Sequence, residues 1–429
     1  MTAPSAVDTA TPRSEGSRVF GQAAIVGVGR LGGAALQAVT FALVARLSGP
    51  AAFGSFAAVY GVVVVLQALF GFGLVQTIVS RRAAGRDRDP AERVVDDGIA
   101  RVALRMSLCV TVAALMLTTV AALSLGMIFG VPAFVGVLVA WGLVDNYVES
   151  WLGLSLADGR VYENAIATIA RRSVALLVVV VAVAESGNTA LCAAVGLLAG
   201  SAIVLPLVIW RNKRHMPGAL GLSWSVATYR SSRGFWINSL AVQLRNFDVA
   251  ILAVTGASAL AVGMYGAASR LVSPFRIIPT SFALVLMPHA SRVGRSGARA
   301  LLAPVLLVVA LSSIVFASIA ALSPFVIPMF LGDSYVDAVP CIQIICVGLV
   351  FASMASQFSS LLQGWGHTNL VATVAVISCA ATFVGLGFVG GFGLGAVTAA
   401  VVLCIAFAVQ ALLLALFVGS IFKEGGVNA

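Results

Sequence analysis

Residues 20–47 read FGQAAIVGVGRLGGAALQAVTFALVARL, and residues 52–79 read AFGSFAAVYGVVVVLQALFGFGLVQTIV. A membrane-crossing helix needs about 20 mostly apolar residues, and each of these runs exceeds that length. Only Ser48-Gly49-Pro50-Ala51 separates them, and glycine followed by proline is typical of a turn. The stretch therefore predicts two helices that cross a membrane one after the other.

The rest of the chain has the same character. Of its 429 residues, 60% are hydrophobic and 10% are charged, and the mean hydropathy is +1.05. Soluble domains carry about 25% charged residues, so this chain could not cover its own surface in water. The composition predicts an integral membrane protein and excludes a secreted disulfide scaffold, a nucleic-acid-binding domain and most soluble enzymes.

Ten further apolar runs predict an all-α bundle of about twelve transmembrane helices. The longest polar stretch, 211–232, divides them into two lobes of six helices, 19–214 and 215–421, which we expect to surround a central cavity. Tails at 1–18 (disordered) and 422–429 are expected on the cytosolic side. The ten further runs are 98–122, 131–155, 165–184, 188–210, 233–255, 259–288, 300–323, 338–362, 370–389 and 393–421.

Basic residues predict the orientation, because loops rich in Lys and Arg stay in the cytosol. With the N-terminus inside, 19 of the 26 basic residues lie in cytosolic segments, and the opposite loops carry Glu185, Asp333 and Asp337. We expect a cell-membrane protein with both termini cytosolic. The 19 residues are Arg13, Arg18, Arg81, Arg82, Arg86, Arg88, Arg93, Arg160, Arg171, Arg172, Arg211, Lys213, Arg214, Arg230, Arg233, Arg292, Arg295, Arg299 and Lys423.

The two lobes show weak internal similarity, with a Gly- and Tyr-containing helix (Gly54, Tyr60; Gly263, Tyr265) after the first span of each. Repeats of six spans are parallel, as in transporters built from two halves. Proline kinks a helix, so Pro274, Pro279 and Pro288 predict a break in span eight. Gly71 and Gly73 predict a comparable break in span two, and such matched breaks favour moving, substrate-lining helices.

The sequence contains no convincing motif for nucleotide binding, hydrolysis or metal binding. The run Gly27-Val-Gly29-Arg-Leu-Gly32 spells G-x-G-x-x-G, but it lies inside an apolar span and lacks the preceding strand of a dinucleotide site. Walker A, zinc-protease and G-x-S-x-G sequences are absent, and no cysteine has zinc-ligand spacing. The sequence predicts no catalytic residue, no metal and no cofactor.

Polar residues at bilayer depth are costly and tend to face a cavity or a partner. Arg245 and Asp248 stand three apart, so they are expected to pair on one helix face. Asp145 and Glu149 stand four apart and either bind a coupling proton or Na⁺, or meet arginines from the other lobe. The predicted lumen residues are Arg30, Gln37, Gln67, Arg245, Arg270 and Arg276, and the ion-coupling candidates are Asp145, Glu149 and Asp248.

Several short motifs resemble those of bacterial polysaccharide flippases of the O-antigen and capsule type, within the multidrug/oligosaccharidyl-lipid/polysaccharide exporter superfamily. The resemblance covers about residues 20–421. It rests on Ala45-Arg46-Leu47-Ser48-Gly49-Pro50, Phe53-Gly54, Phe72-Gly73-Leu74 through Ser80-Arg81, Val262-Gly263, Tyr265, Ala268, Arg270-Leu271, Gly332, Tyr335, Ala338 and Leu362-Gln363-Gly364 through His367.

The resemblance implies a two-lobed bundle that moves a polyprenyl-diphosphate-linked oligosaccharide to the outer leaflet by alternating access, driven by H⁺ or Na⁺. Guanidinium groups suit a diphosphate, so Arg30, Arg270 and Arg276 are expected to contact it while Asp248 holds Arg245. The three interior carboxylates depart from a strongly cationic lumen and leave neutral or cationic cargo open.

Three alternatives remain at this stage. A drug or metabolite cation antiporter of the same superfamily would depend on the carboxylates. A glycan polymerase or ligase would need a large external loop with catalytic Arg or His, and the longest outer loop, 324–337, holds none. A non-transporting scaffold would not need buried charges. The expected partners are the lipid-linked cargo and membrane lipids, without nucleic acid, and a monomer is expected.

Overall fold

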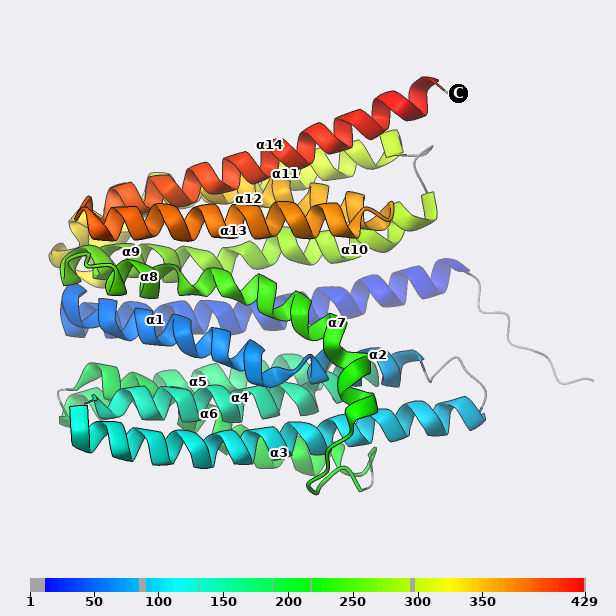
Figure 1. The fold of residues 1–429 in the computed structure, drawn as a ribbon, viewed down its shortest axis with the longest axis horizontal. Coiled ribbons are helices and arrows are strands. Elements are labelled where there is room, and N and C mark those ends of the chain that lie inside the picture. The colour runs from blue at the N-terminus through cyan, green and yellow to red at the C-terminus, as the bar shows by residue number, and fades with distance from the viewer. Residues whose placement is uncertain are drawn as a thin grey trace, which may run out of the picture.

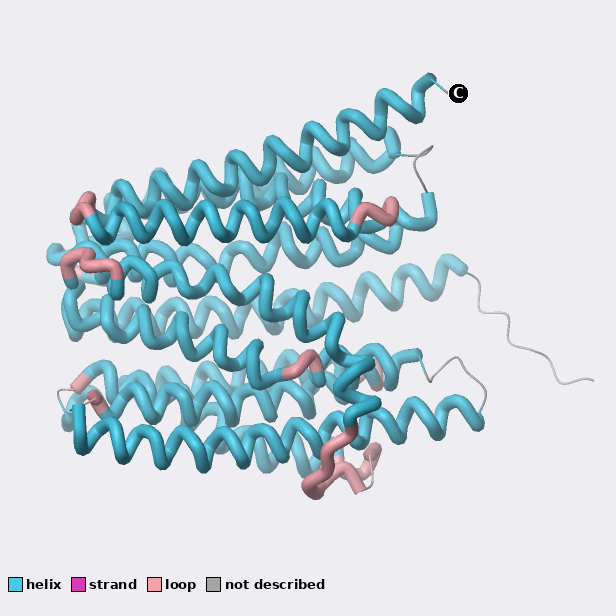
Figure 2. Tube along the Cα trace, in the orientation of Figure 1, coloured by secondary structure: helices cyan, strands magenta, loops and turns pink. Residues whose placement is uncertain are grey.

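The computed structural model describes residues 12–84, 90–129, 131–186, 188–216, 218–293 and 298–427. In this part of the chain the regular structure is entirely helical (Figure 2). The all-α membrane prediction is confirmed. Side-chain caps begin several helices where a loop ends: Asn188, Ser225 and Ser258 each accept a hydrogen bond from the backbone N–H three residues on, which satisfies a donor that the helix itself leaves open.

The helices follow one another with short connections. The first half holds α1 (Pro12–Gly71), α2 (Leu74–Ala84), α3 (Pro90–Phe129), α4 (Ala133–Ala157), α5 (Val161–Ser186) and α6 (Thr189–Asn212). The second half holds α7 (Val226–Gln243), η1 (Leu244–Phe247), α8 (Asp248–Val254), α9 (Ala259–Val272), η2 (Ser273–Arg276), α10 (Ile277–Val293), α11 (Ala298–Leu331), η3 (Asp333–Ala338), α12 (Val339–Gly364), α13 (Thr368–Gly391) and α14 (Gly395–Val427).

Nine helical segments of the described chain are long and apolar enough to cross a membrane, against the twelve spans predicted. One of the nine, Gly27–Gly71, joins the first two predicted spans. Predicted span four is α4, which carries Asp145 and Glu149, and span eight is divided between α9 and α10 by a 3₁₀ turn. The remaining predicted spans coincide with single apolar segments, so the count differs because spans one and two are joined, span eight is divided, and α4 is not among the nine segments.

The predicted helix breaks are present. Span two is interrupted after Gly71, where Phe72 and Gly73 have φ of 46° and 67°; only glycine adopts such angles at little cost. Span eight is interrupted by η2, which contains Pro274. Pro279 lies in α10, and the side chain of Pro288 falls outside the described residues. A third break, η1 in span seven, carries no glycine or proline and was not predicted.

The structure corrects the predicted location of two basic residues. Arg171 and Arg172, counted among the cytosolic basic residues, lie inside α5, ten and eleven residues after its start. At 1.5 Å per residue this places them about 15 Å along the helix, well inside a membrane. For Arg171 the physical reason is an ion pair, described below, that removes the cost of an isolated charge there, whereas Arg172 lies over the ring of Trp141.

The bundle has two ends that differ in packing. The described start of α1 and the end of α14 lie at the same end, which we call the terminal end; the opposite end, with the turns between α8 and α9 and between α13 and α14, is the far end (Figure 1). In Figure 1, α2–α6 and α9–α14 form separate groups, with α1 between them and α7 crossing from the second group to α2 and α3.

The two lobes meet closely toward the far end. A Cβ added at Gly54 would lie 2.7 Å from the backbone nitrogen of Gly263, so these two helices touch through their backbones, as small residues allow in membrane bundles. The hydroxyl of Tyr335 donates to the carbonyl of Ala45 at 3.1 Å, and Arg46 donates to the carbonyl of Met329 at 2.8 Å. The far end is therefore held shut by direct lobe-to-lobe contact.

The membrane orientation is directly testable. We expect single cysteines at Lys213 and Asp333, introduced into a Cys-free variant, to react with an impermeant thiol reagent from opposite sides of the membrane, Lys213 from the cytosol. Both side chains are exposed and lie at the terminal and far ends. Labelling of both sites from one side would contradict the topology, and labelling of Asp333 from the cytosol alone would invert it.

Candidate functional site

Two arginines of the second lobe converge on one aromatic ring. Arg245 lies in η1 and Arg276 in η2, so both extend from the 3₁₀ turns that interrupt spans seven and eight. Their guanidinium carbons lie 5.2 Å and 5.6 Å from the ring centroid of Phe407 on α14. Attraction between a cation and the face of a ring reaches about 2 kcal/mol when water is excluded, so Phe407 stabilises both cations.

Neither arginine is neutralised by an acid. Arg245 donates from Nη2 to the side-chain oxygen of Gln410 at 2.7 Å, one helical turn beyond Phe407. Within the described residues, no carboxylate lies within 4 Å of either guanidinium. Both groups are only partly exposed. Two unneutralised cations at bilayer depth call for water or an anionic ligand.

Arg270 has a different environment. Its Nη2 lies 3.2 Å from Asp248 and 3.0 Å from the carbonyl of Asn246, and its Nη1 donates to the Asn246 side chain at 3.1 Å. The hydroxyl of Tyr265 donates to the other oxygen of Asp248 at 3.1 Å. Arg270 and Asp248 are both buried, so this is a fully enclosed and hydrogen-bonded ion pair.

The expected pair between Arg245 and Asp248 is therefore wrong. Spacing on one helix permits a pair, but it does not exclude partners on neighbouring helices, and here Asp248 faces α9 while Arg245 faces α14. The consequence is an exchange of roles. Arg270, which we expected to be free for a ligand, is occupied, and Arg245 is the residue without a counter-ion.

A chain of aromatic contacts links this pair to the first lobe. The guanidinium carbon of Arg270 lies 5.9 Å from the ring centroid of Tyr60, whose hydroxyl accepts a hydrogen bond from Gln37. Tyr60 stacks on Trp141 at 5.3 Å, and Arg172 lies 5.8 Å from the Trp141 ring centroid. Gln37 thus contacts Tyr60 and not Arg270 itself, at a place where the two lobes meet.

Asp145 and Glu149 share a single arginine. Nη1 of Arg171 lies 2.8 Å from Asp145, and Nη2 lies 2.5 Å from Glu149. Asp145 also accepts from the hydroxyl of Ser201 at 2.7 Å. Arg171 is 2% exposed, whereas the side chain of Glu149 is 45% exposed. We define Arg171, Asp145, Glu149 and Ser201 as the α5 charge cluster.

This cluster bears on the two alternatives that the sequence left for the acidic pair. The carboxylates do meet an arginine, but from their own lobe rather than the other one. A proton or Na⁺ would have to compete with Arg171 for them, because its guanidinium already occupies an oxygen of each carboxylate. A coupling role for these residues stays a prediction.

The remaining predicted lumen residues are dispersed. Gln67 donates to the carbonyl of Gly142 at 3.1 Å, which ties α1 to α4. The side chain of Arg30 is exposed, and none of the contacts within the described chain joins it to Arg245, Arg270 or Arg276. Arg30 is therefore not part of the arginine pair on Phe407.

Sequence reasoning missed several members of the site. Gln410 was detectable, since it is the one amide in the apolar run 393–421. Phe407 and Tyr60 were not, because aromatic residues are common in apolar helices and only tertiary structure places them beside a cation. Arg171 was counted with the cytosolic basic residues although it falls inside the predicted span 165–184.

Comparisons with known proteins identify the family and the fold. A family model described as polysaccharide biosynthesis protein matches residues 21–293. No curated protein matches the sequence significantly. Among solved structures, an inward-facing multidrug resistance MATE family transporter of the MOP superfamily aligns with a TM-score of 0.69 at 16% identity, covering 92% of this chain and 99% of that one.

Two further structures have the same fold. An outward-facing multidrug resistance MATE family transporter of the MOP superfamily aligns with a TM-score of 0.68 at 16% identity, covering 95% and 97% of the two chains. A MOP superfamily transporter from Pyrococcus furiosus, whose reversed pocket polarity is said to suggest a different function, aligns with a TM-score of 0.66 at 14% identity, covering 94% and 96%.

Proposed function

Because the chain belongs to the polysaccharide biosynthesis protein family and has the fold of MOP superfamily transporters, we propose that it is a flippase for a polyprenyl-diphosphate-linked oligosaccharide. It would carry the cargo from the cytosolic to the outer leaflet by alternating access. The family and the structures with this fold are transporters rather than enzymes. The identity of the cargo and the direction of its transport are the proposed part.

The arrangement of Arg245 and Arg276 on Phe407 carries this proposal. Two other interior arginines are neutralised by acids: Arg270 is paired with Asp248, and Arg171 with two carboxylates. Arg245 and Arg276, by contrast, contact one ring and have no carboxylate within 4 Å among the described residues. A diphosphate presents two adjacent anionic groups, and guanidinium forks bind phosphate oxygens with two hydrogen bonds at once.

The location of the pair also suits a lipid-linked cargo. Arg245 and Arg276 lie at the breaks of spans seven and eight, and α7 crosses from the second lobe to α2 at the terminal end (Figure 1). The far end is shut by the contacts of Gly54, Tyr335 and Arg46. With the terminal end cytosolic, this state would receive the head group from the cytosolic leaflet, and parting of the far-end contacts would release it outside.

A cation antiporter is the competing function. It needs a carboxylate free to bind a cation, and both Asp145 and Glu149 are bonded to Arg171, while Asp248 is bonded to Arg270. Two unpaired guanidinium groups would also repel cationic drugs. The structure therefore favours an anionic cargo.

The decisive experiment reconstitutes the protein in liposomes with a fluorescent polyprenyl-diphosphate sugar. We expect protein-dependent movement of this lipid between leaflets and none of a cationic dye such as ethidium. In cells, depletion is expected to leave completed lipid-linked oligosaccharide in the cytosolic leaflet. Transport of ethidium without the lipid would establish the antiporter instead, and an unfinished sugar chain on depletion would indicate an assembly enzyme.

A further inference from the structure

The ends of α2–α6 at the terminal end enclose a second polar pocket, away from the arginine pair. Its volume is about 250 Å³, and it is lined by Arg82, Arg93, Asp97, Asp158, Arg160 and His215. Every lining side chain is ionisable, and together they carry three guanidinium groups against two carboxylates. The pocket walls come from the end of α2, the start of α3, the α4–α5 turn and the segment after α6.

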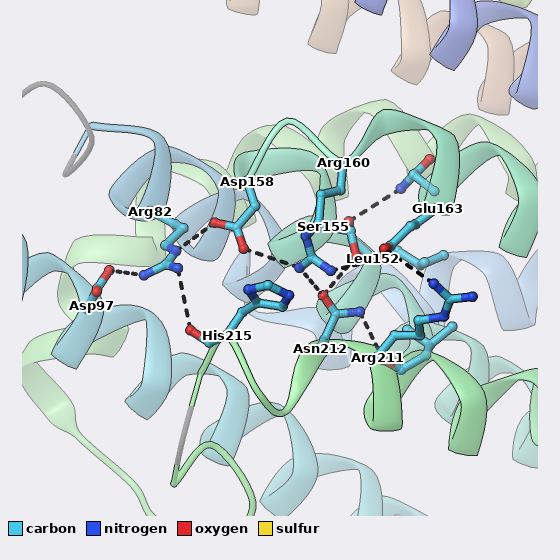
Figure 3. Close-up of polar contacts among 12 residues, drawn as sticks. Arg82, Asp97, Leu152, Ser155, Asp158, Arg160, Glu163, Arg211, Asn212 and His215 are labelled. Atoms are coloured by element: carbon cyan, nitrogen blue, oxygen red, sulfur yellow. Dashed lines mark hydrogen bonds and ion pairs between the residues drawn. The ribbon is translucent and has the colours of Figure 1, made fainter.

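Ion pairs fix the walls of this pocket (Figure 3). Arg82 lies between two carboxylates, donating from Nε to Asp158 at 2.8 Å and from Nη1 to Asp97. Burial lowers the pKa of Arg82, but these two hydrogen bonds and charges outweigh it, so the pKa lies above its ordinary value. Arg160 continues the network to Asp158 at 3.2 Å and to Glu163 at 2.8 Å.

Both acidic groups of the pocket are therefore already neutralised, while part of the basic lining is not. Arg93 is exposed to the pocket and forms no hydrogen bond or ion pair within the described structure. The Nε atom of Arg160 is buried without a hydrogen-bond partner. The imidazole of His215 lies between Arg82 and Asn212 in Figure 3, and no contact in the described chain engages it. A buried donor left without a partner costs free energy.

These open donors and the net positive lining favour an anion. An added cation would meet the guanidinium of Arg93 and find Asp97 and Asp158 occupied by Arg82 and Arg160. A phosphate group offers several oxygens to the exposed lining side chains of Arg93 and His215, and its size suits a pocket of this volume.

The surroundings point to a phosphate attached to a lipid. Val94 and Val95 directly follow Arg93 and are strongly exposed, at 72% and 62%, and Tyr162, two residues after Arg160, is also exposed. Apolar side chains and a tyrosine beside a basic pocket at the end of a transmembrane bundle are typical of the membrane interface. Basic pockets between helices on the cytosolic side are known to bind anionic lipid head groups.

We propose that the pocket lined by Arg93, Arg160 and His215 binds the phosphate of an anionic phospholipid at the cytosolic surface. A bound lipid would connect the starts and ends of four first-lobe helices through one head group. Because Arg245 and Arg276 belong to the other lobe, this lipid site is separate from the cargo site and does not depend on the cargo assignment.

The test measures binding of phosphatidylglycerol, phosphatidylcholine and inorganic phosphate to the purified full-length protein, by native mass spectrometry and by thermal stabilisation in detergent. We expect phosphatidylglycerol to bind and to raise the melting temperature, with little effect of phosphatidylcholine. Arg93→Gln is expected to weaken phosphatidylglycerol binding about fivefold, the contribution of one basic residue at a charged membrane surface. Arg93→Lys is expected to retain most of it.

The matched control is Arg230→Gln, which removes an equally exposed arginine of α7 that does not line the pocket. Equal weakening in Arg93→Gln and Arg230→Gln, or no weakening in Arg93→Gln, would overturn the site. A third outcome separates the two sources of phosphate. If millimolar inorganic phosphate stabilises the protein, Arg93→Gln abolishes that effect and phosphatidylglycerol is not preferred over phosphatidylcholine, the pocket binds free phosphate and the lipid proposal is overturned. Because Arg93 forms no ion pair with any residue that the structure describes, its replacement leaves the ion-pair network of Figure 3 intact.

Discussion

Arg245→Gln and Arg276→Gln are each expected to lower the rate of lipid flipping in proteoliposomes about tenfold, and the double variant about a hundredfold. A hydrogen bond to a charged group contributes about 1.5–3 kcal/mol, and each guanidinium would lose at least one such bond to the diphosphate. Arg→Lys at either position keeps the charge but loses the planar fork, so an intermediate rate is expected.

Protein abundance separates this effect from misfolding. Neither arginine holds a buried carboxylate, so both variants are expected to insert and purify at normal levels. Arg233→Gln, which removes an exposed arginine of α7, is the matched control and is expected to transport normally. A double variant that is fully active at normal abundance would refute the head-group role of the pair.

The largest effect on stability is expected from Arg171→Met. This change leaves Asp145 buried and Glu149 half-buried without their cation. Removing one partner of a buried ion pair destabilises a protein by about 3–5 kcal/mol. We expect a sharp fall in folded protein, measured by fluorescence-detected gel filtration and by the melting temperature in detergent.

A charge-free cluster provides the internal test. Replacing all three charged members together, Arg171→Met with Asp145→Asn and Glu149→Gln, removes the stranded charges and is expected to restore most of the folded protein. Arg172→Met, which removes the neighbouring arginine that contacts Trp141, is expected to have a much smaller effect. If Arg171→Met is as abundant as the parent, the cluster does not stabilise the fold.

The sequence predicted the bundle well because its signals are local. Apolar runs of sufficient length specify transmembrane helices wherever they occur, and the residues at the breaks of spans two and eight, Gly73 and Pro274, determine backbone geometry by themselves. The break at Leu244–Phe247 carries no such residue. Its position depends on contacts between helices, which sequence does not display.

The partners of the charged residues were harder to predict for the same reason. Spacing correctly placed Asp145 and Glu149 on one face of α4, because a helix turn is fixed by the backbone. Which cation meets them depends on how α5 is rotated against α4, and that is set by the whole packing arrangement. For Arg245 the spacing was misleading. Asp248 lies three residues away and suggested an ion pair, but Asp248 pairs with Arg270 instead.

Five side-chain donors in the described structure bond across the boundary between residues 19–214 and 215–421, each to a main-chain carbonyl group. The donors Arg46, Arg82, Arg105, Trp236 and Tyr335 bond to the carbonyls of Met329, His215, Gly218, Leu69 and Ala45. A carbonyl persists whatever side chain its residue bears. Substitution of a residue whose carbonyl accepts one of these bonds therefore leaves the bond in place. The accepting side of the junction can change in sequence over evolutionary time without a compensating change on the donor side.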